Sequence, residues 1–273
     1  MTQAEKGRRF RALHERDEAF IIPNPWDAGT ARLLAHLGFE ALATTSAGYA
    51  FSVGKRDGAI GRDETLEHVA AIASATDLPV SADLENGFGE TPESVAKTIK
   101  LAAQAGVVGG SIEDSFRNGE GAELYELERA VDRVRAAAQA AHRLSFPFTL
   151  TARAENYLVS KPDLKDTIRR LHAYQEAGAD VLYAPGLSSK NDIATVVSSL
   201  DRPVNVLMGM QGVQLPLAAL SAIGVKRVSI GSALSRAALG AFLRAAQEMR
   251  QNGTFTFAEQ AVSYRDITAM FPD

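Results

Sequence analysis

Three carboxylates follow two predicted strands at positions that would bring them together. Asp83 and Glu85 are two residues apart, so in a strand they would share one face, and Glu113 ends the next predicted strand. Carboxylates gathered on one side repel each other unless a cation lies between them. No His or Cys accompanies them, which favours a hard cation over zinc. The sequence therefore predicts a metal site at Asp83, Glu85 and Glu113 for Mg²⁺, with Mn²⁺ as the alternative ion.

The same carboxylates have a structural interpretation. Asp83 and Glu113 could cap the helices that follow them, and Asp114 could be solvated, because helix N-termini attract negative charge. For any single carboxylate, metal binding and a structural role are equally favoured. The grouping of three carboxylates favours metal binding.

Arg153 ends an otherwise apolar strand that contains Leu150. A buried guanidinium is costly unless it pairs with an anion, and it can bind a carboxylate of a substrate through two hydrogen bonds. The alternative is a buried salt bridge to Glu155, Glu113 or Asp83.

Other residues at the predicted strand ends are candidate substrate contacts. Ser46-Ala47-Gly48 offers a hydroxyl and, in a tight turn, backbone N–H groups that could hold a carboxylate, although such triplets are often ordinary turns. Trp26, after the first predicted strand, and Asn205, in the seventh, are further candidate substrate contacts. The five histidines lie at the N-terminus or in predicted helices, so we assign none to catalysis.

Short apolar runs alternate with longer helical patterns along the chain. Eight strands are predicted, at Phe20–Pro23, Ala41–Thr45, Pro79–Asp83, Gly110–Glu113, Phe148–Arg153, Val181–Ala184, Pro203–Leu207 and Arg227–Ile230. Helices are predicted at Ala28–Leu37, Glu64–Ala75, Glu93–Ala105, Leu124–Ala141, Leu164–Ala177, Ile193–Leu200, Leu215–Ile223 and Ala233–Arg250, with a further amphipathic stretch at Phe257–Met270.

This alternation predicts an α/β fold, a (β/α)₈ TIM-type barrel with an additional C-terminal helix. Gly38, Gly106, Gly178 and Gly224 each follow a helix just before a strand, where a left-handed residue is common. Strands so apolar suit a parallel sheet covered by helices, and eight repeats favour closure. We expect residues 1–273 to form one domain, with the active site at the C-terminal ends of the strands.

Composition excludes several classes of protein. A net charge of −4 with scattered Lys and Arg gives no basic surface for nucleic acid. No window approaches the apolar length of a membrane span, and the N-terminus has no secretory signal, so we expect a cytoplasmic protein with no membrane partner. The absence of Cys excludes disulfides and a cysteine nucleophile.

Several motifs together resemble the isocitrate lyase and phosphoenolpyruvate mutase superfamily over nearly the whole chain. Asp83-Leu84-Glu85-Asn86-Gly87-Phe88-Gly89 matches the acidic, glycine-rich motif after strand three, with Glu85 where aspartate is usual. Ile112-Glu113-Asp114 matches a second motif of the family. Ser46-Ala47-Gly48 matches the family's turn after strand two, and Arg153 matches its arginine after strand five.

The resemblance implies roles for these residues. Asp83 would ligate Mg²⁺, and Glu85 and Glu113 would act through metal-bound water. The Ser46, Ala47 and Gly48 turn would hold the carboxylate of a small α-oxo acid, and Arg153 would contact its oxygens. Asp57 matches the acid of the loop after strand two, so Arg153, Asp57 and Glu113 are the expected catalytic residues.

The chain departs from the family pattern at two places. The Lys-Lys-Cys-Gly-His loop of family lyases is replaced by Ser115-Phe116-Arg117-Asn118-Gly119-Glu120-Gly121, which is expected to lead quickly into a helix. Tyr183-Ala184-Pro185-Gly186 replaces a Pro-Glu-Ala segment after strand six. Cleavage of isocitrate or methylisocitrate is therefore not expected.

These observations predict a Mg²⁺-dependent carbon–carbon lyase or decarboxylase that acts through an enolate, similar to an oxaloacetate decarboxylase. The proton donor could be a metal-bound water, Tyr183 or Tyr49. The alternatives are phosphorus–carbon chemistry of the phosphonopyruvate type, and an α-oxo acid binding protein with little catalysis. By resemblance, we also expect a homo-oligomer, a dimer of dimers that exchanges the last barrel helix.

Overall fold

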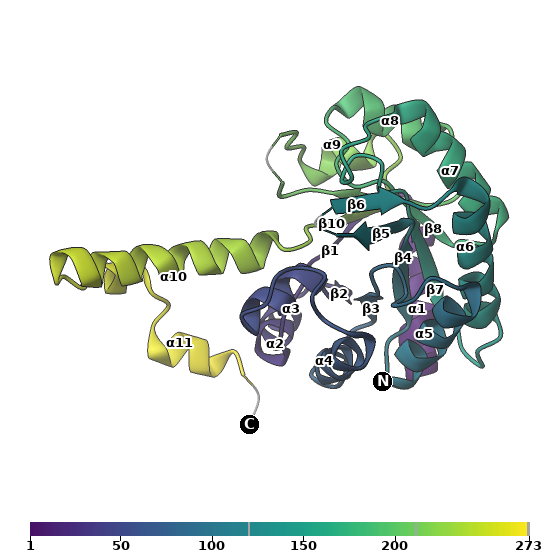
Figure 1. The fold of residues 1–273 in the computed structure, drawn as a ribbon. Helices are drawn as coiled ribbons and strands as arrows, with labels where there is room; N and C mark the ends of the chain where they lie inside the picture. The colour runs from purple at the N-terminus through teal and green to yellow at the C-terminus, as the bar shows by residue number, and fades with distance from the viewer. Residues whose placement is uncertain (120, 211, 272–273) are drawn as a thin grey trace.

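Eight parallel strands form a nearly closed barrel in the computed structural model, which describes residues 1–119, 121–210 and 212–271 (Figure 1). The strands pair in the order β1-β10-β9-β8-β7-β4-β3-β2. Their bounds are β1 Phe20–Ile22, β2 Leu42–Ala43, β3 Val80–Asp83, β4 Gly109–Glu113, β7 Thr149–Arg153, β8 Val181–Tyr183, β9 Val204–Leu207 and β10 Arg227–Ser229. The predicted TIM-type barrel is confirmed, and every predicted strand is present: β4 begins one residue earlier than predicted and the others are shorter than predicted.

Helices cover the outside of the barrel. They are α2 Ala28–His36, α4 Arg62–Ser74, α5 Pro92–Gln104, α6 Leu127–His142, α7 Leu164–Glu176, α8 Lys190–Ser198 and α9 Leu217–Ser221. Local sequence signals mark where these helices begin. The Asp27 side chain caps α2, and the Thr91 side chain caps α5, which has Pro92 at its first position. All four glycines expected after helices have positive φ.

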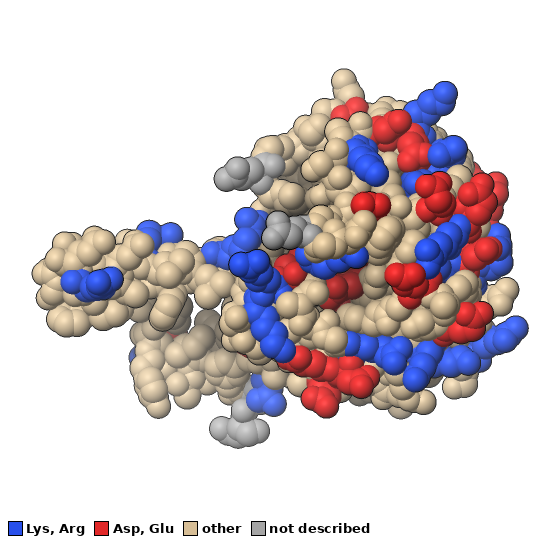
Figure 2. Space-filling model, in the orientation of Figure 1, with Lys and Arg blue, Asp and Glu red and all other residues tan. Residues whose placement is uncertain are grey.

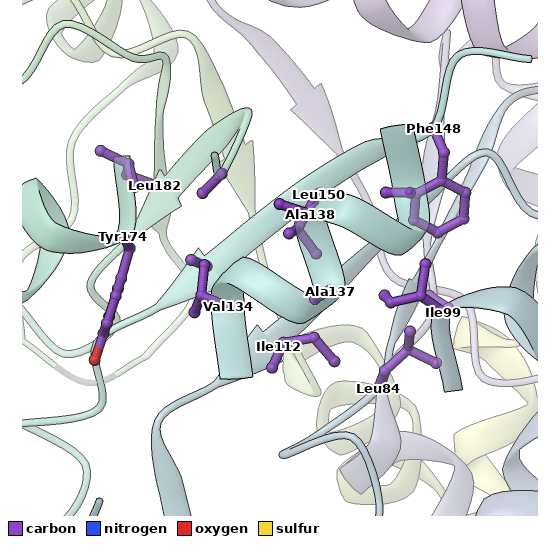
Figure 3. Packing of buried hydrophobic residues seen from close by; sticks show 14 of the residues in the cluster. Leu84, Ile99, Ile112, Val134, Ala137, Ala138, Phe148, Leu150, Tyr174 and Leu182 are labelled. Atoms are coloured by element: carbon purple, nitrogen blue, oxygen red, sulfur yellow. The ribbon is translucent and has the colours of Figure 1, made fainter. Parts of the chain in front are cut away.

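The main hydrophobic core lies between these helices and the strands. Val134 and Ala138 of α6 pack in one buried cluster with Ile99 of α5, Ile112 of β4 and Leu150 of β7 (Figure 3). Burying such aliphatic side chains contributes roughly 1.5–3 kcal/mol each relative to leaving them exposed. The outward residues of the strands therefore anchor the helices and leave the inward residues free to line the barrel.

The barrel closes between β1 and β2 through isolated hydrogen bonds. Ala43 N donates to Pro23 O at 3.1 Å. The buried Asn24 donates through Nδ2 to Thr44 O, and its Oδ1 accepts from the backbone N–H groups of Ile230 and Gly231. One side chain thus connects the ends of β1, β2 and β10.

A helix that the sequence patterns did not predict, α1 (Gln3–Glu15), precedes the first strand. It carries a complete capping box between Thr2 and Glu5, and it buries Phe10 and His14 against the barrel. Gly7 is required where α1 crosses the loop before β7, because an added Cβ would lie 2.3 Å from Pro147 O. The polar N-terminus is therefore part of the fold.

Two loops at the carboxyl ends of the strands differ from expectation. Ser46-Ala47-Gly48 forms the first turn of a short helix, α3 (Ser46–Ser52), capped by the Thr45 side chain. The segment after Glu113 forms an antiparallel hairpin, β5 (Ser115–Asn118) and β6 (Gly121–Leu124), before α6. The expectation that it leads quickly into a helix was wrong, because Tyr125 is buried and its N–H is bonded to Asp114 O, which fixes the hairpin's base.

The C-terminal helices project from the barrel. Figure 1 shows α10 (Ala233–Asn252) running outward, with α11 (Tyr264–Ala269) folded back beside it. Within α10 only Ser235 is buried, whereas Phe242 and Leu243 are 67% and 55% exposed. Among the described residues, no helix has both the length and the apolar character needed to cross a bilayer.

Candidate active site

A polar cavity of about 520 Å³ opens at the carboxyl ends of the barrel strands. In Figure 2, acidic side chains lie recessed in this face of the barrel with basic side chains around them. The residues that carry its chemistry include Ser46, Asp57, Asp83, Arg153, Tyr183 and Asn205. A TIM barrel of this kind carries its active site at this end.

Arg153 lies at the centre of the site. Its Nη1 is 3.0 Å from Asp83 Oδ1 and 3.2 Å from Glu113 Oε2, and its Nη2 is 2.9 Å from Glu155 Oε1. Burial alone would lower the pKa of Arg153, but the three carboxylates raise it well above its usual value. The alternative of a buried salt bridge is therefore present with all three acids, and the guanidinium also faces the cavity.

Asp83 is held at the end of β3 by several donors. Its Oδ2 accepts from the N–H and hydroxyl of Ser46 at 3.2 and 2.8 Å, and its N–H donates to Thr44 Oγ1. Asp83 therefore does not cap the helix that follows it in sequence, because Thr91 caps α5 and Asp83 bonds the first residue of α3. Its carboxylate instead joins the start of α3 to Arg153 across the mouth of the barrel.

Glu85 lies beyond the end of β3, in a left-handed backbone conformation with φ 48°. The expectation that Asp83 and Glu85 share a strand face was wrong, because the chain turns after Asp83. The buried Oε1 of Glu85 has no hydrogen-bond partner in the described structure. Burial, followed by the charges of Asp83, Glu113 and Asp57, raises the pKa of Glu85 to about 8.

A second cavity, of about 570 Å³, adjoins the first beneath the β5–β6 hairpin. Glu85 and Glu113 line it, and Ser46, Asp57, Arg153 and Leu158 line both cavities. Ser115 donates its hydroxyl to Glu113 Oε1 at 3.0 Å. Arg153 thus separates a chamber that contains Asp83 from one that contains the other two predicted metal carboxylates.

Asp114 and Glu155 support the site and were not among the predicted site residues. Asp114 is buried; its Oδ1 accepts from Glu155 N, and its Oδ2 accepts from Arg170 Nη1 and Tyr174 Oη. The interpretation of Asp114 as solvated was wrong. A buried acid held by three hydrogen-bond donors fixes the loop after β7, so the position of Glu155 beside Arg153 is set by the fold.

The predicted substrate contacts fall into two groups. Ser46, Ala47 and Asn205 line the first cavity, as Asp57 does, whereas Gly48 and Trp26 are absent from its lining. A Cβ on Gly48 would lie 2.6 Å from Thr45 Cγ2 and 3.2 Å from Trp26 Cβ, so Gly48 permits close packing of α3. The assignments of Trp26 and Gly48 to the substrate stay predictions that this geometry does not support.

The two candidate tyrosines are placed differently. Tyr183 lines the cavity, and the Arg153 guanidinium lies 5.3 Å from its ring centre. Tyr49 instead stacks on His68 with the ring centres 3.7 Å apart. Burial raises the pKa of Tyr183 to about 12, so its phenol keeps its proton at neutral pH.

The carboxylates fit a hydrated divalent cation. Asp83, Glu85 and Glu113 crowd their carboxyl groups, which helps to raise the pKa of Glu85 and which a cation would relieve, and Glu85 has a buried oxygen without a partner among the described residues. Within the described parts of the chain, no group of three acidic or His side chains forms a ready coordination shell. Mg²⁺ normally keeps several water ligands, so one direct carboxylate and two reached through water suit this ion.

Comparison with known proteins identifies the family. Residues 10–250 match the model described as phosphoenolpyruvate phosphomutase. The chain belongs to this phosphomutase family. The match spans every barrel strand and nearly all of the projecting helix α10, which confirms the resemblance to the isocitrate lyase and phosphoenolpyruvate mutase superfamily.

Relatives of the phosphomutase family match most of the chain. An oxaloacetate decarboxylase of Chromohalobacter salexigens is 29% identical over 247 residues, covering 88% of this chain and 84% of that protein. A 2-methylisocitrate lyase of Halalkalibacterium halodurans is 28% identical over 262 residues, covering 93% and 85%. The crystal structure of a presumed lyase/mutase from Burkholderia cenocepacia J2315 is 61% identical, with a TM-score of 0.96 and coverage of 99% and 97%. The superfamily thus comprises lyases and mutases.

Proposed function

We propose that the protein is a Mg²⁺-dependent carbon–carbon lyase or decarboxylase that acts on a small α-oxo acid. The observation that carries this proposal is the position of Arg153, a buried cation between Asp83, Glu113 and Glu155 with one face on a polar cavity. With a divalent cation offsetting the surrounding carboxylates, such a positioned donor would bind the oxygens of an anionic substrate and stabilise the negative charge that develops on them.

Different residues of the chain orient the substrate and stabilise the charge that develops on it. Ser46 and Ala47 line the cavity beside Asp83, where they contact the carboxylate of the oxo acid. Arg153 donates to the oxo oxygen as the neighbouring carbon–carbon bond breaks and its electron pair passes into an enolate. A bound divalent cation, held by Asp83 and reached through water by Glu85 and Glu113, would supply further polarisation of the oxo group.

The enolate must then receive a proton at carbon. Tyr183 faces the cavity and is protonated at neutral pH, whereas Tyr49 is stacked on His68. A general acid must lie within hydrogen-bond reach of the atom that it protonates. Tyr183 is therefore the better donor of the two.

The test is calorimetric titration of pyruvate, oxaloacetate and 2-oxoglutarate into metal-stripped protein, with and without Mg²⁺. Metal-dependent binding should be lost in Asp83→Ala and weakened about 10- to 100-fold in Arg153→Ala, the value of a charge-assisted hydrogen bond. Arg129→Ala is the control, because Arg129 pairs with Glu90 on the surface.

Product analysis of any ligand that is consumed then separates the reactions. Carbon dioxide indicates decarboxylation, two carbon fragments indicate carbon–carbon cleavage, and phosphate released from phosphonopyruvate indicates phosphorus–carbon chemistry. Tight metal-dependent binding without turnover would instead indicate an oxo-acid binding protein. No binding of any oxo acid, with or without metal, would overturn the proposed site.

A further inference from the structure

Small hydroxyl side chains and a buried arginine line part of the interior of this barrel. TIM barrels normally fill their centre with layers of bulky branched side chains. Here the cavity continues inward past Ser81, Ser111 and Ser229, three small hydroxyl residues on three strands. Arg227, at the start of β10, also lines the cavity although it is buried. The active-site cavity therefore extends down the barrel axis to a guanidinium.

Neutral groups hold this guanidinium. Arg227 Nε donates to Asn205 Oδ1 at 2.9 Å, and Nη2 donates to Thr151 Oγ1 at 2.9 Å. Its Nη1 lies 3.3 Å from His14 Nε2. His14 Nδ1 lies 2.9 Å from Phe10 O, which can only accept, so Nε2 is the free acceptor for Arg227.

No acidic side chain pairs with Arg227 in the part of the chain that the structure describes. Arg153, by comparison, has three acidic partners. A buried charge with neutral partners is costly, and burial lowers the pKa of Arg227 to about 10. The described hydrogen bonds use three of the five guanidinium N–H donors, so two remain for another group.

The position of Arg227 matches the far end of an extended substrate. Its Nη2 contacts Thr151, which lies two residues before Arg153 on β7, and both side chains point into the barrel. Two residues of a parallel strand span roughly 6.6 Å. A ligand whose oxo end binds at Arg153 could therefore place a second group, a few carbon atoms away, against Arg227.

We propose that Arg227 is a specificity-determining residue that binds a second carboxylate of the substrate inside the barrel. This inference rests on the proposed function, and it defines the substrate as an α-oxo acid with a further carboxylate directed along the barrel axis. A carboxylate paired with a guanidinium is stabilised against leaving as carbon dioxide. The reaction accordingly keeps this group and breaks a carbon–carbon bond nearer Arg153.

Arg236 is the competing candidate for the same role. It lines the cavity from α10, is exposed, and donates to Gly209 O at 3.2 Å. An exposed guanidinium binds a carboxylate weakly because water screens the charges. Arg227 is buried and already charged without an acid, so it gains more from the ligand's carboxylate.

The experiment compares two ligands that differ in one group, 2-oxoglutarate and 2-oxopentanoate, which carries a methyl in place of the second carboxylate. Calorimetry in Mg²⁺ gives the ratio of their Kd values for the wild type, Arg227→Gln, Arg227→Lys and Arg236→Gln. The wild type should prefer the diacid by about 10- to 100-fold. Arg227→Gln should lose this preference with little change for 2-oxopentanoate, Arg227→Lys should keep part of it, and Arg236→Gln should keep it.

Other outcomes overturn the inference. These are an equal affinity of the wild type for both ligands, a preference that survives in Arg227→Gln, or a preference lost in Arg236→Gln alone. If formate strengthens 2-oxopentanoate binding in the wild type but not in Arg227→Gln, the residue binds a separate anion. The wild-type comparison remains decisive if Arg227→Gln does not fold. Failure of the proposed function is distinct, because neither oxo acid would then bind in a metal-dependent way.

Discussion

The chemical properties of single residues in this site depend on their buried surroundings as much as on their residue type. Arg153 and Arg227 are both buried, yet one is surrounded by acids and the other by an amide, a hydroxyl and an imidazole. The two guanidiniums therefore differ in what they offer a ligand. Arg153 is a positioned donor whose charge is already balanced, and Arg227 carries a charge that lacks an acidic partner among the described residues.

Replacement of Tyr183 by Phe should lower kcat by about 100-fold or more and change KM little, because the phenol is the proposed proton donor to the enolate. Steady-state turnover of the substrate found by titration measures this change. Tyr49→Phe is the matched control and should retain activity, since Tyr49 stacks on His68 outside the cavity. Equal losses in both variants would contradict the assignment.

His14 should make the protein sensitive to mild acid. Burial, followed by the charge of Arg227, lowers the pKa of His14 to about 3, whereas an unfolded histidine titrates near ~6.5. Between these values the unfolded state binds the extra proton, so the free energy of unfolding falls as pH drops below about 6.5, by up to about 1.4 kcal/mol per pH unit.

Urea unfolding at a series of pH values from neutral to mildly acidic measures this dependence. His14→Gln should flatten it, because glutamine does not titrate. The exposed His36→Gln is the control and should keep the wild-type slope. An unchanged slope in His14→Gln would assign the acid sensitivity to other groups. Arg227, the Phe10 carbonyl and the rings of Phe10 and Phe20 contact His14. His14 also lines a cavity whose charged residues are Arg11, Glu15, Asp180 and Arg202.

At the scale of elements, three segments position the site. The β5–β6 hairpin covers the cavity of Glu85 and Glu113, and Arg117 ties it to the loop after α3 through a 2.7 Å bond to Asp57 O. Helix α3 presents Ser46 to Asp83. Helix α1 supports the far end of the barrel through His14, directly below Arg227.

Gly7→Ala should destabilise the protein through α1. The new Cβ would meet the Pro147 carbonyl at 2.3 Å, and the backbone there must shift. Overpacking of this kind costs about 1–3 kcal/mol, which corresponds to a fall in Tm of about 2–10 °C for a chain of this size. Gly29→Ala is the control: it also lies in a helix, but its Cβ would make only a 3.4 Å contact with Asp27. Thermal unfolding should show a fall for Gly7→Ala alone.

The sequence predicted the elements better than the contacts between them. The strands at Thr149–Arg153 and Arg227–Ser229 were predicted because short segments rich in β-branched and apolar residues, placed between helical patterns, are local signals. The hairpin was not predicted, although Asn118-Gly119 is a turn signal. The segments on either side of this dipeptide contain charged residues such as Arg117 and Glu123 and show no clear alternation of apolar and polar residues. The contacts of Arg227 with Thr151 and His14 join residues 76 and 213 positions apart, which no local pattern encodes.

At the scale of the whole molecule, the projecting helix is the feature that the barrel does not explain. Leu239, Phe242 and Leu243 are exposed on α10, and Figure 2 shows few charged side chains along this arm. Most of the stability of a helix in a protein comes from packing of its apolar face, and contiguous exposed apolar side chains mark an interface. We propose that a second copy of the chain covers it by exchange of α10.

Light scattering should therefore give a mass above the 29.1 kDa of one chain, and four times that value for a dimer of dimers. Phe242→Asp should reduce the mass, because a charge on this surface must be desolvated in the interface. Arg250→Glu, at the end of the same helix, is the control and should leave the mass unchanged. A wild-type mass of one chain would overturn the exchange.

The junction between β1 and β2 has a consequence for how the barrel opens. It lacks a ladder of paired residues and relies on the Ala43 to Pro23 bond and on the side chain of Asn24. Opening there requires the loss of a few hydrogen bonds rather than a full strand pairing, so amide protons on either side should exchange with solvent faster than those between β4 and β7. Because Asn24 also holds Ile230 and Gly231, such an opening would release the segment that leads into α10, so the projecting helix would change its direction toward a second barrel without global unfolding.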